Sequence, residues 1–278
     1  MNIRMSRYTA IMAFIISFLA LFAALKGLLN QSLYEEVRLA GAMTKFLVTG
    51  SLAQDFISVP LGLILALLSL VFLKRPGLKI FIAILGLTGF FFYAYGLYVI
   101  QGQYTSIYLV YLAIFGLSIY TLLFGLTGFE LNAIAHYRLS WAIRISISLF
   151  LFLTLLVLVP VWLLRMMPDI GRHIPGDTYG VFILDLCVVF PAFGIIITQL
   201  LRNKPYGNIL AGVALLKALT ITLSVAFGEW FQAFYGSRQP DYGMIVIFSV
   251  LTIVSLVLLV FYLIKLKTNP KYDSIKRG

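Results

Sequence analysis

Eight long apolar runs dominate the pattern of hydrophobic and polar positions along the chain. A helix of about 20 residues crosses the roughly 30 Å of hydrocarbon in a bilayer, and the runs have about that length. They lack the strict alternation that strands of a membrane β-barrel show. We therefore expect an all-α integral membrane protein with eight transmembrane helices, at residues 8–28, 57–73, 79–100, 105–128, 143–165, 179–201, 207–228 and 242–265.

Composition excludes the main alternatives to this picture. The chain has 278 residues, of which 62% are hydrophobic and 11% charged, and its mean hydropathy is +1.01. Soluble domains are about 45–50% apolar and about 25% charged. The chain is therefore neither a soluble globular protein nor a disordered one, and little of it is expected outside the bilayer.

The distribution of Lys and Arg predicts the orientation in the membrane. Of the 21 Lys and Arg residues, 14 fall in segments on the same side as both termini, 6 fall on the opposite side, and Lys217 lies within a span. Because cytoplasmic segments carry the excess of basic residues, we expect both termini in the cytoplasm. The same bias explains most of the net charge of +11 without a nucleic-acid partner. Residues 269–278 then form a cytoplasmic basic tail that attracts anionic lipid.

Landmarks in the first half of the chain recur about 130 residues later. Asp55 corresponds to Asp185, and Pro60 corresponds to Pro191. The offset spans four expected helices, and an even number of spans preserves the orientation. We therefore expect two parallel four-helix repeats, residues 1–130 and 131–268, related by an axis along the membrane normal, as some transporters have. The alternative is that Pro and Gly recur by chance at helix ends.

Short motifs with acidic, proline and tyrosine residues are spread over residues 50–225. They are Gln54-Asp55 to Pro60, Phe92 to Tyr98, Tyr108 to Tyr111, Leu117 to Tyr120, Leu184-Asp185 to Pro191, Lys204 to Gly207 and Leu215 to Lys217. Together they resemble a widespread group of uncharacterised multi-pass membrane proteins of bacteria and archaea. The resemblance implies the cell membrane of a bacterium or archaeon, and it implies no activity, substrate or cofactor.

Two ionisable residues lie inside the expected spans. Lys217 is near the middle of 207–228, and Asp185 is about two turns inside 179–201. A charge at the bilayer centre costs about 2.5–3.5 kcal/mol, so such residues need a functional or a structural reason to be there. A short loop joins the two spans, and the residues differ in depth by about one helical turn. We expect them to pair, directly or through water, either as a polar site for a substrate or protons, or only as a lock between two helices.

Asp55 is the counterpart of Asp185 in the first half, but no lysine accompanies it at the matching position. We expect Asp55 to cap the helix that begins near residue 57 and to shape the mouth of a site. Pro60 and Pro191 each lack an N–H and leave a carbonyl free four residues earlier. We expect both prolines to kink their helices. Each kink either opens a polar cavity beside an Asp or is one that membrane helices tolerate.

Tyrosines are concentrated on one face of the third span and of the fourth. An aromatic belt at the membrane interface explains Tyr98 and Tyr108. Tyr95 and Tyr111 share these faces but lie deeper, because they are one turn further from the connection at 101–107. We expect Tyr95 and Tyr111 either to extend this belt or to line the approach to a ligand site.

The remaining polar segments indicate neither a metal nor a cofactor. Asp169, His173 and Asp177 lie in a connection that Pro and Gly interrupt, which predicts a solvated loop. His136 and His173, the two histidines, fall on opposite sides of the membrane, which argues against bis-His haem ligation. No phosphate-binding glycine loop and no H-E-x-x-H motif occurs. The outer connection 29–56 carries charges among apolar residues and is expected to hold a short amphipathic helix, as a lid or a linker.

These observations favour a permease or transporter-like protein for a small solute. Asp185 and Lys217 would form its substrate site, Tyr95 and Tyr111 its approach, and Asp55 its mouth. The first alternative is a non-transporting accessory or scaffold subunit, whose partner would be another membrane protein or a second copy of the chain. The second is an intramembrane enzyme that modifies lipid, for which no nucleophile and base are visible.

Overall fold

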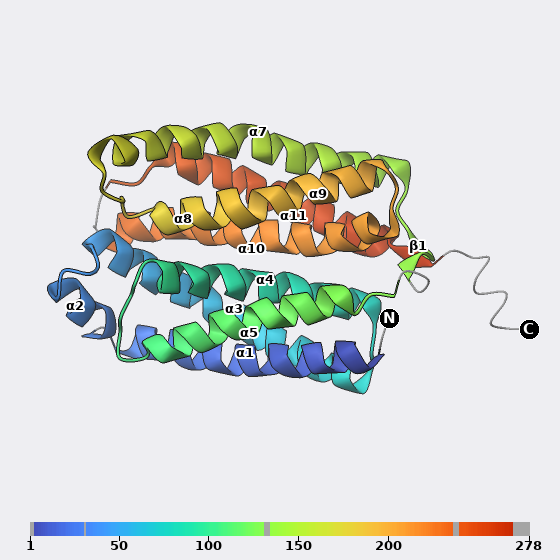
Figure 1. Cartoon of the computed structure of the whole chain (residues 1–278), viewed down its shortest axis with the longest axis horizontal. Helices are drawn as coiled ribbons and strands as arrows, with labels where there is room; N and C mark the ends of the chain where they lie inside the picture. The colour runs from blue at the N-terminus through green and yellow to red at the C-terminus, as the bar shows by residue number, and fades with distance from the viewer. Residues whose placement is uncertain (1–2, 31, 131–133, 236–238, 269–278) are drawn as a thin grey trace, which may run out of the picture.

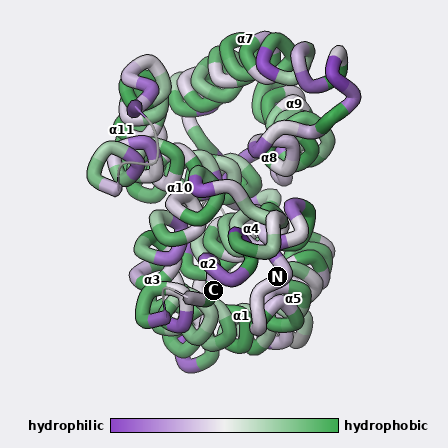
Figure 2. The backbone as a smooth tube through the Cα atoms, turned by 90° about the vertical axis from the view of Figure 1, so that its left-hand side faces the viewer, coloured by the Kyte–Doolittle hydropathy of each residue, from purple (hydrophilic) through white to green (hydrophobic). Residues whose placement is uncertain are grey.

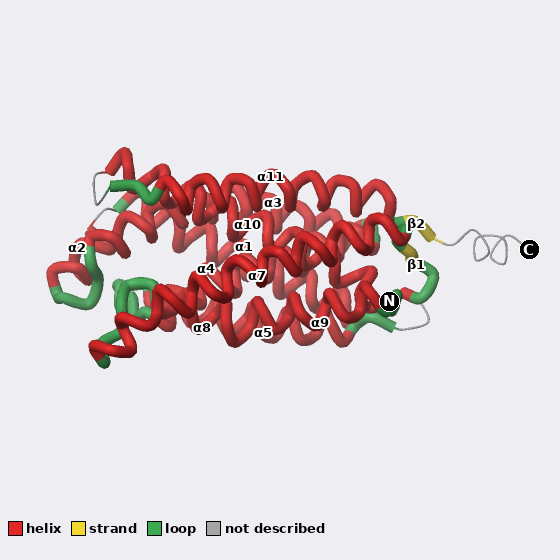
Figure 3. Tube along the Cα trace, turned by 90° about the horizontal axis from the view of Figure 1, so that it is seen from above, coloured by secondary structure: helices red, strands yellow, loops and turns green. Residues whose placement is uncertain are grey.

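The apolar runs form long helices that lie side by side in this computed structural model (Figures 1 and 3). The structure describes residues 3–30, 32–130, 134–235 and 239–268, so the predicted tail at 269–278 lies outside it. Eight helices of the described chain are long and apolar enough to cross a membrane, which makes this a multi-pass membrane protein. The elements are α1 (Ile3–Leu29), α2 (Ser32–Leu39), α3 (Lys45–Lys74), α4 (Leu78–Ile100), α5 (Tyr108–Thr127), β1 (Tyr137–Arg138), α7 (Trp141–Arg172), α8 (Tyr179–Leu184), η1 (Asp185–Val189), α9 (Phe190–Leu201), α10 (Pro205–Tyr235), α11 (Tyr242–Lys265) and β2 (Lys267–Thr268).

The second span begins well before the position that the sequence predicts. The connection expected at 29–56 is largely helical, because α1 runs to Leu29, α2 follows, and α3 starts at Lys45. Thr44 caps α3 by accepting a hydrogen bond from the N–H of Leu47. The expected short amphipathic helix is present as α2. The polar residues near the start of α3 are buried against other parts of the protein. The low hydropathy of this segment therefore reflects a buried helix and not a loop.

The helices form two groups that are visible end-on in Figure 2. In the first group α1 packs on α3 and α5, and α4 packs on α5. In the second group α7 packs on α9, and α10 packs on α9 and α11. Helix α4 lies against α10, and smaller contacts join α3 to α10 and α4 to α8. Apolar side chains cover the outside of the bundle, as a lipid-facing surface requires.

Glycines bring α4 and α10 into close contact. A Cβ atom at Gly86 would lie 2.7 Å from the Cβ atom of Leu216, and a Cβ atom at Gly212 would lie 2.7 Å from Cγ2 of Ile82. Each glycine of one helix therefore receives an aliphatic side chain of the other. Small residues serve this purpose at helix contacts in membranes, where backbone approach and van der Waals packing drive association.

The two ends of the bundle differ. We call the end that holds α2 the α2 end, and the opposite end, where β1 pairs with β2 beside the start of α1, the β end (Figure 3). Side chains bridge separate helices at the β end: Tyr262 donates to the carbonyl of Asn208 at 2.9 Å, and Arg144 donates to the carbonyl of Leu200 at 3.0 Å. These bonds tie the helix ends together there.

Candidate functional site

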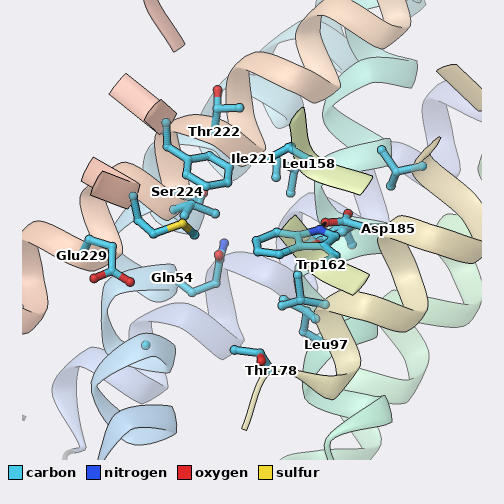
Figure 4. A pocket seen from close by; sticks show the side chains of 18 of the residues that line it. Gln54, Leu97, Leu158, Trp162, Thr178, Asp185, Ile221, Thr222, Ser224 and Glu229 are labelled. Carbon is cyan, nitrogen blue, oxygen red and sulfur yellow. Dashed lines mark hydrogen bonds between the residues drawn. The ribbon is translucent and has the colours of Figure 1, made fainter. Parts of the chain in front are cut away.

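A cavity of about 490 Å³ lies within the second group of helices and is bordered by the first. It reaches from loop residues at the α2 end, such as Gln103 and Thr178, down to Lys217. Figure 4 shows side chains from several helices around it, with Trp162 and Gln54 among them. Its size is that of pockets for small molecules. The polar residues that line it include Ser51, Gln54, Gln101, Thr154, Asp177, Asp185, Lys217, Thr222, Ser224, Glu229 and Gln232.

Lys217 lies in the middle of the α10 span and borders the cavity. The side chain of Lys217 passes Gly89 of α4, where an added Cβ atom would be 3.9 Å from its Cδ atom. The ammonium nitrogen lies 3.8 Å from the ring centroid of Tyr93, one turn further along α4. The negative face of an aromatic ring attracts a cation, and this contact gains strength away from water. The glycine therefore makes room for the lysine, and the tyrosine positions its charge.

Asp185 opens the one π-helical turn of the described chain, which ends just before Pro191. The N–H of Phe190 bonds to the carbonyl of Asp185, five residues back, instead of following the α-helical pattern. Proline has no N–H to offer, so the backbone is irregular at this point for a local reason. The carboxylate oxygen Oδ2 accepts a hydrogen bond from Nε1 of Trp162 at 2.7 Å, and the Trp162 ring stacks against Phe248.

The expected partners Asp185 and Lys217 border the same cavity. Both residues are described, and no direct ion pair joins them, although their charges interact. Tyr93 interacts with both residues. Its ring lies under the Lys217 ammonium, and its hydroxyl interacts with the Asp185 carboxylate. The two residues that the sequence singles out therefore share one cavity. A water-mediated bridge between Asp185 and Lys217 stays a prediction.

Charged groups nearer the α2 end are held by protein partners. Arg165 forms an ion pair with Asp241 at 2.9 Å, and Glu229 accepts a hydrogen bond from the N–H of Asp241 at 3.2 Å. The Asp177 carboxylate accepts from the hydroxyl of Thr44 at 2.8 Å. These bonds connect α7, α10, α11 and the start of α3 around the upper part of the cavity.

Asp55 lies in a second cluster of polar side chains, inside the first group of helices. It is buried ten residues after the start of α3, so the expectation that it caps the helix is wrong. Oδ2 accepts a hydrogen bond from the Tyr34 hydroxyl of α2 at 2.6 Å, and Oδ1 accepts a longer one, 3.4 Å, from Tyr98. Gly27 of α1 is required here, because any Cβ atom at that position would collide with Asp55.

Tyr95 and Tyr111 belong to the Asp55 cluster and do not line the cavity. Their ring centroids are 5.7 Å apart, and both rings pack against Tyr98. Tyr34 from α2 completes the cluster. Burial, with the nearby Tyr98 and Asp55, holds the pKa of Tyr34 well above its ordinary value of 10.0, so its hydroxyl stays a donor to Asp55 at neutral pH. Tyrosine rings thus pack the interior of the first group of helices around Asp55.

The two prolines differ in their surroundings. Helix α3 continues through Pro60 without a break in its α-helical assignment, whereas Pro191 follows the π-helical turn. The expected kink at Pro60 stays a prediction. The fifth span runs further than expected, because α7 extends to Arg172, so the expectation that Asp169 lies in a solvated loop is wrong. From the last turn of α7, Asp169 accepts hydrogen bonds from Arg172 and from the N–H of Gly176. Within the described residues, no group of three or more His, Cys, Asp or Glu side chains could hold a metal ion.

Sequence reasoning missed several cavity residues that a helical pattern could have found. Tyr93 and Leu97 of α4 and its C-cap residue Gln101 recur at intervals of four, and all three line the cavity. Tyr95 lies on a different face of α4 and does not border the cavity, whereas Tyr98 borders the cavity and also packs on Tyr95. Helix α4 therefore contributes side chains to both groups of helices. On α7, Trp162 has no polar neighbour in the sequence to mark it, and only the fold brings it to Asp185.

Comparison with known proteins adds no relative, since no protein-family model, no curated protein and no solved structure matches this chain.

Proposed function

We propose that this protein is a permease-like carrier that binds a small solute in the cavity described above. The observation that carries the proposal is the position of Lys217, which is in mid-span and borders a cavity of about 490 Å³ that extends to the α2 end. Ionisable residues at this depth usually mark substrate or ion pathways. The proposed site consists of Asp185 and Lys217, with Tyr93 and Trp162 as the side chains that position them.

A purely structural role for the Asp185–Lys217 pair fits less well. A buried lock between helices needs direct contact and sealed packing to offset desolvation. Lys217 forms no direct ion pair with Asp185, and its buried side chain borders a cavity instead of being sealed by packing on every side. This arrangement favours a site that receives a ligand over a subunit whose polar pair only holds helices together.

The proposal includes a duplicated architecture, with residues 1–130 and 131–268 as two parallel repeats. Three features support it. Helices α4 and α10 run in the same direction and meet at Gly86 and Leu216, which are 130 residues apart. Helices that are counterparts in the two halves have the same neighbours: α1 packs on α3 as α7 packs on α9, and α4 packs on α5 as α10 packs on α11. Helix α3 contacts α10 as α8 contacts α4. Carriers built from repeats bind solute where the repeats meet.

The proposal also fixes an orientation in a bacterial or archaeal cell membrane. The excess of Lys and Arg on the side of the termini places the β end in the cytoplasm. The α2 end, and with it the end to which the cavity extends, then faces outward. The side-chain bonds at the β end would close the inner side in this state. The structure would therefore correspond to an outward-facing carrier.

Native mass spectrometry of the protein released from a mild detergent tests the proposal. We expect a co-purified small molecule on the wild-type protein, its loss from Lys217→Met, and its retention in Lys204→Met, which removes an exposed lysine near the β end. Lys217→Met should remain folded by thermal denaturation. Unfolded Lys217→Met protein, or a stoichiometric protein partner with no small molecule on the wild type, would instead support the scaffold interpretation.

A further inference from the structure

The ammonium group of Lys217 has hydrogen-bond donors to spare. A lysine ammonium carries three donors and no acceptor. Within the described residues, Lys217 contacts the Tyr93 ring and interacts with the charge of Asp185, but it donates no hydrogen bond and forms no ion pair. The cavity is the space into which these donors can act. A ligand that satisfies them must present an acceptor, and an anionic acceptor gives the strongest bond.

Asp185 is already supplied with a donor by the protein. Its Oδ2 atom accepts from Trp162 at 2.7 Å. The other charged groups of the cavity, Arg165, Asp177 and Glu229, have protein partners near the α2 end. At the deep end of the cavity the Lys217 donors therefore have no acceptor among the described residues, whereas the Asp185 acceptor already has a donor. This arrangement favours an anionic ligand.

Charge balance restricts how an anion can bind there. Asp185 and Lys217 together carry no net charge, whether both are ionised or the proton has moved between them. The elements around them add Tyr93 from α4 and Trp162 from α7, and α3 and α11 add no charged group to the lining of the cavity, since Asp55 of α3 does not border it. A monoanion that enters alone would leave one uncompensated charge away from water, which costs several kcal/mol. One proton that binds to the pair restores neutrality.

The cavity walls indicate the rest of the ligand. The lining of the cavity is mainly aromatic and aliphatic, so the body of the ligand should be apolar. The side chains that form these walls are Phe150, Leu158, Val181, Phe190, Phe193, Ile221, Val225, Met244 and Phe248.

From these features we infer that the cavity binds an organic monocarboxylate with an apolar body together with one proton. The carboxylate accepts hydrogen bonds from Lys217, and the proton taken from solvent resides on the Asp185–Lys217 pair. This inference rests on the proposed function, since it names the ligand class of the same site. It would make the carrier a symporter of an acid anion and a proton.

Isothermal titration calorimetry of the full-length protein in nanodiscs tests the inference, with empty nanodiscs as the reference for partition into lipid. The probes are benzoate, 4-phenylbutyrate and octanoate, each compared with its primary amide. The proton number comes from titrations in two buffers of different ionisation enthalpy. We expect saturable binding of at least one carboxylate, binding of its amide at least tenfold weaker, and uptake of one proton for each carboxylate bound.

Variants separate the two parts of the inference. Lys217→Met should weaken carboxylate binding at least tenfold and Lys204→Met should leave both affinity and proton uptake unchanged. The double variant Asp185→Asn with Lys217→Arg carries a fixed positive charge, because arginine stays protonated. It should bind the carboxylate without proton uptake. If this variant does not fold, the proton number of the wild-type protein decides alone.

Three results would overturn the inference: no saturable binding of any carboxylate to the folded protein, equal affinity for carboxylate and amide, or a proton number of zero for the wild type. These results leave the proposed function intact if native mass spectrometry finds a different small molecule that depends on Lys217. Absence of any bound molecule in both experiments would count against the site itself.

Discussion

Gly86 of α4 receives the side chain of Leu216 of α10, and these two residues are separated by the same 130 positions that separate Asp55 from Asp185. Ile82 and Gly212 form a second contact with the same spacing. In a contact between parallel helices related by a two-fold axis, each residue lies near its own counterpart. The packing of α4 on α10 thus supports the duplication that the spacing of sequence landmarks suggests, and it does so with residues that those landmarks do not include.

Substitution of Gly86 tests the close contact between α4 and α10. Gly86→Ala should lower the free energy of unfolding by about 1–3 kcal/mol, because the new Cβ atom overpacks against Leu216. Adding Leu216→Ala should recover part of the loss. Gly116→Ala on α5 is the matched control, because nothing lies within 4 Å of the added atom there. Equal stability of Gly86→Ala and Gly116→Ala in mixed-micelle unfolding would show that the α4–α10 contact is looser than described.

Tyr34→Phe should destabilise the protein by about 1.5–3 kcal/mol, because the buried Asp55 loses its short hydrogen bond. Tyr8→Phe on the exposed surface of α1 should change stability by less than about 0.5 kcal/mol. Since the pKa of Tyr34 is raised in the folded state, its contribution is full below its ordinary pKa of 10.0 and declines as the pH rises beyond it. The difference between wild type and Tyr34→Phe should therefore stay constant between about pH 7 and pH 9. A stable Tyr34→Phe protein would contradict the assigned bond.

Trp162→Phe should cost about 1–3 kcal/mol in stability, because Asp185 loses a donor while the aromatic packing on Phe248 is largely kept. Trp230→Phe, on an exposed side chain of α10, is the control. A double-mutant cycle with Asp185→Asn isolates the bond between the two residues, and its coupling energy should exceed about 0.5 kcal/mol. Strictly additive effects would mean that Trp162 does not position Asp185.

Local sequence patterns predict the spans and the presence of Asp185 and Lys217 in one cavity, while their pairing stays a prediction. Hydropathy and length identify helices that face lipid, and the short loop before α10 makes the sixth and seventh spans neighbours. The sequence places the start of α3 too late because Ser51 and Asp55 look like loop residues until their partners Gln103 and Tyr34 are known. Partners of this kind come from tertiary packing, which periodicity does not contain.

The tyrosines illustrate the same limit. Periodicity placed Tyr95 and Tyr98 on one face of α4, and they do share a cluster. It could not say that Tyr95 packs against Tyr111 of α5, or that Tyr93 and Tyr98 both border the cavity. A helix packed between two groups has two interior faces, and the sequence of that helix alone does not assign them.

The most direct test of the central claim is whether solvent outside the cell reaches the cavity. In a Cys187→Ala background, which removes the single native cysteine, Ser224→Cys places a thiol in the cavity and Leu223→Cys places one on the neighbouring exposed apolar face. Intact cells are treated with a charged, membrane-impermeant methanethiosulfonate reagent. We expect rapid labelling of Ser224→Cys and little labelling of Leu223→Cys, where lipid excludes the reagent. No labelling of Ser224→Cys from outside, with labelling after the cells are opened, would contradict the outward-facing cavity.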